Sequence, residues 1–148
     1  MDELKPDYET LYHTFKQMRD SGKKLDGEIS AWVNAIEKKN QVMLDLFTSA
    51  IEGGSNYWYI IENHNKDAVG CKFLVETPFK HGGFVTVSSM EEPELPHVKI
   101  DLEKLTKGWD VFKRKAHSHF MDVLNDNADA ATGDVFLQCV CFGDIIYG

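Results

Sequence analysis

The sequence predicts an α+β fold, in which N-terminal helices precede a small antiparallel sheet of three to four strands, and C-terminal helices follow it. Two observations support this prediction. Apolar residues recur at helical spacing at both ends of the chain, whereas the middle consists of short segments rich in β-branched and aromatic residues. One layer of helices over one face of the sheet is the simplest way to bury both apolar sets.

The first third of the chain predicts helices, because its apolar residues recur near every 3.6 positions. The expected helices cover residues 7–18, 27–39 and 41–52. Asn40 is only a weak break, so the second and third segments can also form one bent helix. Gly53 and Gly54 are expected to end this region, because glycine adopts the left-handed conformation of a helix C-terminus at little cost.

The middle of the chain predicts strands over residues 57–63, 69–76, 84–89 and 97–101. Turn-forming residues separate these segments, and no helical segment lies between them. Such spacing favours an antiparallel meander, since parallel strands need a longer crossover connection.

Helical spacing returns in the last third, where residues 101–124 predict one long amphipathic helix. A final helix is expected over residues 131–141, and residues 144–148 form either a short strand or a packed tail. No repeat or linker divides the chain, so the sequence predicts a single domain over residues 1–148.

The composition is typical of a globular cytoplasmic protein. Of the 148 residues, 43% are hydrophobic and 27% are charged. No apolar run approaches the roughly 20 residues that span a bilayer, so no membrane partner is expected. Three cysteines, an odd number, fit a reducing compartment. The formal net charge of −8 disfavours strong nucleic-acid binding, which needs clustered lysines and arginines.

Familiar catalytic and metal-binding motifs are missing from the sequence. It contains no nucleophile elbow, phosphate-binding loop, dinucleotide-binding glycine pattern or zinc-protease motif. His117 and His119 would point about 200° apart on a helix, so they are not expected to share a metal ion. No metal or cofactor is therefore expected, and a binding function is favoured over an enzyme.

Acidic residues gather near the start of the last helix, at Asp126, Asp129 and Asp134. Their spacing is less dense and less regular than a calcium-binding loop requires. Helix capping is favoured over catalysis, with Asp129 accepting amide hydrogen bonds at the helix start and Asp134 in the first turn.

The segment GGSNYWY, residues 53–59, combines flexible and aromatic residues. On a strand, Tyr57 and Tyr59 share one face, while Trp58 lies on the other face and is expected in the core. The tyrosine rings can stack on a base, and the glycines permit a ligand to approach the backbone closely. A purely structural role and a role as core plus binding site both stay open.

Two segments resemble a family of small, uncharacterised proteins that phages and prophages encode. The family has the pattern A-x-E-G-G-x-x-Y-W, matched at residues 50–58, and a C-terminal pattern close to D-x-x-x-Q-x-x-x-F-G-[DE]-[IV]-[IV]-Y-G, matched at residues 134–148. The resemblance covers about a third of the chain and implies a viral origin and a setting in the host cytoplasm. It implies no activity.

The polar residues of these two segments suggest a binding site. Gln138 lies among apolar neighbours and shares a helix face with Phe142, so it needs partners from the backbone or from a ligand. The leading hypothesis is capture of a nucleotide-like small molecule, a host immune signal, by an anti-defence sponge. The expected ligand contacts are Gly53, Gly54, Asn56, Tyr57, Trp58, Tyr59, Gln138 and Asp144.

If the ligand carries phosphate, nearby positive side chains must offset the net negative charge of the protein. The candidates are His64, Lys72, Lys113 and Arg114. Two other hypotheses stay open. One is a protein–protein inhibitor of a host factor, which would use the aromatic stripe and the C-terminal end. The other is an enzyme that processes nucleotides or nucleic acids with Asp134 and Asp144, or with His64 and a carboxylate. A homodimer is also expected.

Overall fold

The computed structural model describes residues 7–148. Contacts within the chain divide these residues into two compact units, residues 7–41 and residues 42–148, which are described separately below. The expectation of a single domain stays a prediction. None of the described helices combines the length and the apolar character that a bilayer crossing requires.

The first unit contains α1 (Tyr8–Asp20) and the N-terminal part of α2 (Gly27–Ser49). Asp7 caps α1 by accepting a hydrogen bond from the Thr10 amide at 3.0 Å. Arg19 joins the two helices, because its guanidinium donates to Asn34 Oδ1 at 3.0 Å and to Glu37 Oε2 at 2.5 Å. Of the two alternatives for residues 27–52, a single helix forms without a break at Asn40, although its α-helical part ends at Ser49 and a π-helical turn follows.

The helices of the second unit include the remainder of α2, the π-helical turn η1 (Ala50–Gly54), α3 (Leu102–Lys115), α4 (His117–Leu124) and α5 (Ala130–Phe142). The prediction of one helix over residues 101–124 was wrong, because Ala116 leaves helical geometry at φ −124° and ψ 48°. The break lets Phe120 pack edge-on against Trp109, at 5.7 Å between ring centroids. The spacing of apolar residues along the sequence does not predict this contact.

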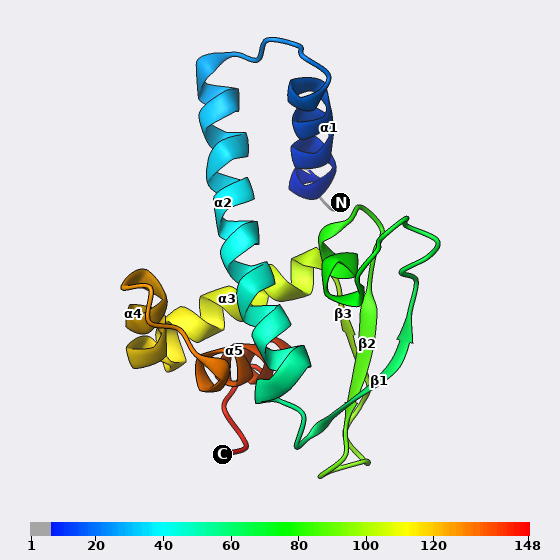
Figure 1. Ribbon diagram of the computed structural model, residues 1–148, viewed down its shortest axis with the longest axis vertical. Coiled ribbons are helices and arrows are strands. Elements are labelled where there is room, and N and C mark those ends of the chain that lie inside the picture. Colours follow the sequence, from blue (N-terminus) through cyan, green and yellow to red (C-terminus); the bar gives the residue numbers. More distant parts are fainter. Residues whose placement is uncertain (1–6) are drawn as a thin grey trace, which may run out of the picture. The chain divides into compact units, whose positions relative to one another are not determined.

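The sheet contains β1 (Tyr59–His64), β2 (Val85–Ser89) and β3 (Val98–Ile100) in the order β1-β2-β3, and both pairings are antiparallel. This confirms the small antiparallel sheet. Figure 1 shows the strands in the second unit, beside the crossing of α3 and α5.

The strand expected over residues 69–76 was wrong. Turns occupy its first part, including Gly70 at φ +76°, and the 3₁₀ helix η2 (Leu74–Phe79) occupies the rest. The Glu76 carboxylate accepts from the Phe73 amide at 3.2 Å, which closes the start of η2 locally. Apolar and β-branched content thus produced a false strand signal where local hydrogen bonds favour a helical turn.

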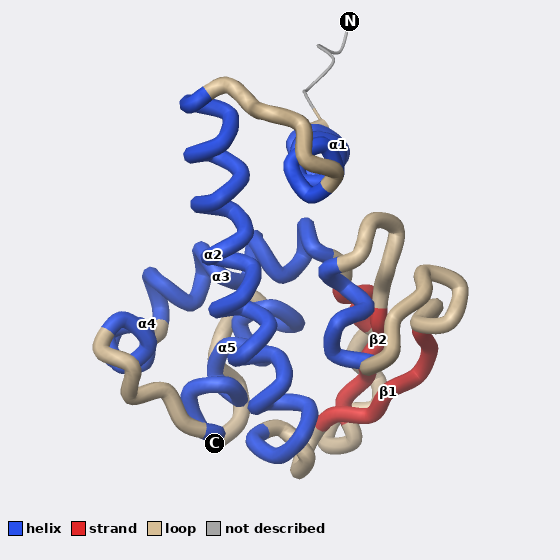
Figure 2. The backbone as a smooth tube through the Cα atoms, turned by 45° about the horizontal axis from the view of Figure 1, so that its top comes forward, coloured by secondary structure: helices blue, strands red, loops and turns tan. Residues whose placement is uncertain are grey.

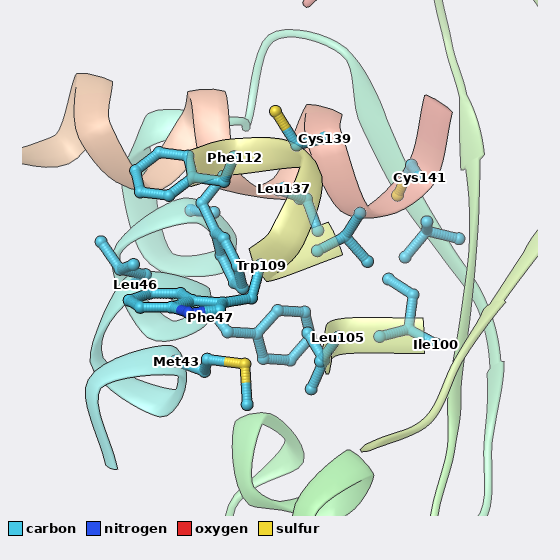
Figure 3. Close-up of a cluster of buried hydrophobic side chains, with 14 of the residues drawn as sticks. Met43, Leu46, Phe47, Ile100, Leu105, Trp109, Phe112, Leu137, Cys139 and Cys141 are labelled. Carbon is cyan, nitrogen blue, oxygen red and sulfur yellow. The ribbon is translucent and has the colours of Figure 1, made fainter. Parts of the chain in front are cut away.

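The core of the second unit lies where α3 and α5 cross and where the sheet meets them. Figure 3 shows side chains from α2, α3, α5 and β3 converging in this core. Gly108 permits the close crossing, because a Cβ atom there would lie 2.4 Å from Val140 Cγ2. Val85 and Val87 supply the buried face of β2. The blue helices and red strands of Figure 2 confirm the α+β class for this unit.

Candidate functional site

The two sequence motifs meet in space, although about 80 residues separate them in the chain. The π-helical turn η1 approaches the start of α5 so closely that a Cβ atom at Gly54 would lie 2.2 Å from the Ala130 carbonyl oxygen and 3.4 Å from Asp134 Cβ. A Cβ atom at Gly53, by contrast, would have no other atom within 4 Å. The second glycine of the motif therefore serves a close backbone approach.

Asp134 is the centre of a polar cluster at this junction. Its Oδ1 atom accepts hydrogen bonds from the Ser55 hydroxyl and the Trp58 indole N–H, both at 2.7 Å. Its Oδ2 atom accepts from the Tyr57 hydroxyl at 2.7 Å and from Gln138 Nε2 at 3.2 Å. We call these five residues the Asp134 cluster. Both carboxylate oxygens thus have their hydrogen bonds supplied by the protein itself.

Gln138 extends the cluster to the C-terminal tail, residues 144–148. Its side-chain oxygen accepts from the amides of Ile146 at 2.9 Å and Tyr147 at 2.8 Å, and its Nε2 donates to the Tyr147 carbonyl at 3.3 Å. The fully buried Gln138 side chain therefore supplies the hydrogen bonds that the tail backbone would otherwise form with a neighbouring strand. The tail is held without forming a strand of its own.

Aromatic rings cover the Asp134 cluster from the side of the tail. The buried ring of Trp58 lies 5.2 Å from the Phe142 ring and 5.6 Å from the Tyr147 ring, between centroids. The Tyr147 hydroxyl lies 2.7 Å from Ser89 Oγ at the end of β2. The expectation that Trp58 lies in the core is confirmed.

Tyr57 is the exposed member of the cluster, with 46% of its surface accessible. Burial of its hydroxyl, together with the hydrogen bond to the Asp134 carboxylate and the charge of that carboxylate, raises the pKa of Tyr57 from 10.0 to about 12. The hydroxyl therefore stays neutral and acts as a donor to Asp134, while the ring remains open to solvent.

The remaining expected contact residues lie around the cluster but not in it. Gly53 and Asn56 are exposed, and Tyr59 is half-buried with its hydroxyl donating to the Ile51 carbonyl. Asp144 is exposed at the start of the tail, where its Oδ1 accepts from the Ile145 amide at 2.8 Å and its Oδ2 lies 3.7 Å from Lys115 Nζ. The structure thus brings Tyr57, Trp58 and Gln138 together and leaves Asp144 apart.

Sequence reasoning missed the two most central polar partners. Ser55 was not among the expected ligand contacts, and Asp134 was interpreted as a helix-start residue or an acid–base group. One signal could have found both, because a buried tryptophan N–H and a buried glutamine need acceptors, and Asp134 lies one helical turn before Gln138.

At the start of α5 the expected cap at Asp129 is confirmed, whereas the expectation that Asp134 lies in the first turn was wrong. Asp129 is the N-cap residue, and its Oδ1 accepts from the Thr132 amide at 2.9 Å. These hydrogen bonds to Thr132 lower the pKa of Asp129. His119 Nδ1 lies 3.4 Å from Thr132 Oγ1, and His117 is exposed at the start of α4. Residues 7–148 contain no group of three or more potential ligands that could hold a metal ion.

A separate cleft of about 370 Å³ is lined in part by Phe142. The segment 95–99 lines it together with Lys104 of α3 and with Cys141 and Phe142 of α5. We call it the cationic cleft, because Lys99, Lys104 and His97 line it whereas no carboxylate does. None of the four positive candidates expected from the sequence is among its lining residues.

The lysines of the cleft have no carboxylate partner among the described residues, although the Lys99 ammonium packs on an aromatic ring. Lys99 Nζ lies 4.7 Å from the centroid of the Phe84 ring, and within residues 7–148 neither lysine forms a salt bridge. Burial raises the pKa of the Cys141 thiol, and the positive charge of Lys104 opposes this effect only partly. Cys141 is therefore neutral and does not cancel the charge of the lysines.

The two sites differ in what they can do chemically. The Asp134 cluster uses its polar groups internally, which suits it to hold segments together. The cationic cleft combines two lysines that form no salt bridge among the described residues with an aromatic side chain, which suits it to bind an anionic ring compound. No protein-family model, curated protein or solved structure matches this chain, so the resemblance to small phage proteins stays a prediction.

Proposed function

We propose that this protein captures a nucleotide-like small molecule and thereby acts as an anti-defence sponge for a host immune signal in the host cytoplasm. One observation supports the proposal most directly. In a chain with a formal net charge of −8, no carboxylate lines the cleft of about 370 Å³, and its lining includes two lysines, a histidine and a phenylalanine beside Leu95, Pro96, Val98 and Cys141.

This composition suits a nucleotide because each part of the ligand has a counterpart. Ammonium groups form strong charge-assisted hydrogen bonds with phosphate oxygens. An aromatic side chain offers a stacking surface that any base can use. The Asp134 cluster contributes indirectly, since its member Trp58 packs against the Phe142 ring at 5.2 Å between centroids. The contacts expected from the sequence stay a prediction, and they are Gly53, Gly54, Asn56, Tyr57, Trp58, Tyr59, Gln138 and Asp144.

The test is mass spectrometry of small molecules that heating releases from protein purified from cells with an active nucleotide-signalling defence. We expect an intact nucleotide at a near-integral ratio to the subunit or the dimer. A double Lys99→Gln and Lys104→Gln variant, purified in parallel, should carry less of it. Release of no small molecule would contradict the proposal, and a processed nucleotide would indicate an enzyme instead.

A second candidate function, inhibition of a host protein, is favoured by exposed apolar side chains around the two motifs. Tyr57, Met90, Ile145 and Ile146 are each 39–46% exposed. They lie on adjoining segments, because the Met90 amide donates to the Trp58 carbonyl at 2.6 Å and the Tyr147 hydroxyl lies 2.7 Å from Ser89 Oγ. Exposed apolar side chains on adjoining segments favour a protein interface.

This second candidate is tested by affinity capture and by measuring the oligomeric state. Ile146→Glu should abolish capture of a stoichiometric host protein, or dissociate the expected homodimer in light scattering. Leu124→Glu is the matched control, since Leu124 is 61% exposed on α4. Equal behaviour of the two variants would contradict an interface at the motif surface.

A further inference from the structure

We infer that the cationic cleft selects a ligand of mononucleotide size, with one phosphate group bound by Lys99 and Lys104 and one ring against Phe142. This inference rests on the proposed function and specifies its ligand class. It places the ligand on residues outside the aromatic motif of residues 53–59. Three features of the cleft lead to it, namely its size, its charge and its fixed aromatic wall.

The size of the cleft favours one nucleotide unit. Small-molecule sites typically measure about 300–1,000 Å³ and cover most of the ligand surface. At about 370 Å³ the cleft is near the lower end of this range. A dinucleotide would leave its second unit outside the cleft, where it would gain few contacts.

The charge of the cleft favours one phosphate group. Lys99 extends from β3 and Lys104 from the first turn of α3, so two elements place a positive charge at the same opening. The start of α3 is already capped, because Asp101 Oδ1 accepts from the Lys104 amide at 2.8 Å. The ammonium groups, and not the helix terminus, are therefore the donors for an anion. Two lysines balance one phosphate in a protein that otherwise repels anions.

The aromatic wall is fixed before any ligand arrives. The Phe142 ring packs at 5.2 Å from the Trp58 ring and at 5.9 Å from the Tyr147 ring, between centroids. Trp58 is in turn fixed by its 2.7 Å hydrogen bond to Asp134. A wall held in this way loses little conformational freedom when a ring binds against it.

Isothermal titration calorimetry at low salt tests this inference with four probes, which are adenosine 5′-monophosphate, adenosine, inorganic phosphate and cyclic di-adenosine monophosphate. We expect the monophosphate to bind most tightly. Lys99→Gln and Lys104→Gln should each weaken its binding about tenfold, as the loss of one charge-assisted hydrogen bond predicts. Lys107→Gln is the matched control, because Lys107 lies on the same helix, is exposed and does not line the cleft.

Two results would overturn the inference. One is tighter binding of the cyclic dinucleotide than of the monophosphate. The other is equal affinity of the Lys99→Gln, Lys104→Gln and Lys107→Gln variants for the monophosphate. If none of the four probes binds while heating still releases another nucleotide, the inference is wrong and the proposed function stands. If no small molecule is released either, both are wrong.

Discussion

The Asp134 cluster and the cationic cleft both adjoin Phe142, which packs against Trp58 of the cluster and lines the cleft, yet their polar groups have opposite surroundings. In the cluster, one buried carboxylate receives four hydrogen bonds from side chains of the protein. In the cleft, Lys99 and Lys104 form no salt bridge among the described residues. The comparison separates groups that hold the fold from groups that are available to a ligand.

The difference also shows how one helix can serve both purposes. Asp134 and Gln138 of α5 face the motif segments, whereas Cys141 and Phe142 near its end line the cleft. Substitutions in the cluster should therefore change the free energy of unfolding, and substitutions of the cleft lysines should change binding alone. The predictions below test this division.

The largest effect is expected for Asp134→Ala. Removing the carboxylate leaves the buried Ser55 hydroxyl and Trp58 N–H without their acceptor, at a cost of roughly 1–3 kcal/mol for each donor. We expect the free energy of unfolding in urea to fall by about 4 kcal/mol. Asp110→Ala, an exposed aspartate on α3, is the control and should change stability little. A loss of similar size in both variants would contradict a central role for Asp134.

Gly54→Ala should destabilise the protein by about 1–3 kcal/mol, because the added methyl group would overlap the Ala130 carbonyl and push α5 away from η1. Gly53→Ala is the matched control in the preceding position, where a methyl group would meet no atom within 4 Å. Thermal unfolding of the two variants measures the difference. Equal midpoints would show that the approach of η1 to α5 is less tight than the structure indicates.

Gln138→Leu should release the C-terminal tail, because three hydrogen bonds to Ile146 and Tyr147 are lost. Hydrogen exchange should accelerate at these two amides, with a loss of stability of about 2 kcal/mol. Gln17→Leu, on the exposed surface of α1, controls for the change in polarity. Unchanged exchange at Ile146 and Tyr147 would show that something other than Gln138 holds the tail.

Tyr57→Phe should reduce the alkaline sensitivity of the fold. The folded-state pKa is raised from 10.0 to about 12, so the neutral hydroxyl stabilises the folded protein fully below pH 10, and this contribution disappears as the pH rises towards 12. Urea unfolding at pH 9, 10 and 11 should show a smaller decline for Tyr57→Phe than for the unchanged protein. Parallel declines would mean that the hydroxyl does not bond to Asp134 in solution.

The smallest effect on stability is expected for Lys104→Gln. Its side chain forms no salt bridge among the described residues, so the free energy of unfolding should change by less than about 0.5 kcal/mol. Urea unfolding measures this change beside the weakened nucleotide binding predicted above. A large loss of stability would show that Lys104 stabilises the folded protein. It would contradict the prediction that substitutions of the cleft lysines change binding alone.

The local pattern of the sequence was sufficient for several elements. Helical periodicity predicted α1 and α5 to within two residues at each end, and the turn residues around residues 84–89 predicted β2. Asp129 was predicted as a cap because an N-cap needs only a carboxylate near its own helix. These features depend on neighbours in the chain, which the sequence displays directly.

Where packing between distant segments decides, the sequence was insufficient. Residues 101–124 keep one helical period through Ala116, and only the contacts of Phe120 with α3 reveal the break. Residues 69–76 are apolar enough for a strand, yet turns occupy the first part of this segment and η2 begins at Leu74, so here local hydrogen bonds decide instead of distant packing. Periodicity records which side of a segment is apolar but not which neighbour will cover it.

The sequence by itself determined that this is an α+β protein with two polar–aromatic motifs worth explaining, because apolar spacing and turn residues act over a few positions. Only the tertiary structure decided that Ser55, Tyr57 and Trp58 share the carboxylate of Asp134, and that Lys99 and Lys104 open onto one cleft. The physical reason is that the strength of a hydrogen bond, and of the interaction between two charges, depends on the distance between the atoms involved. Chain folding sets those distances for residues that are far apart in sequence.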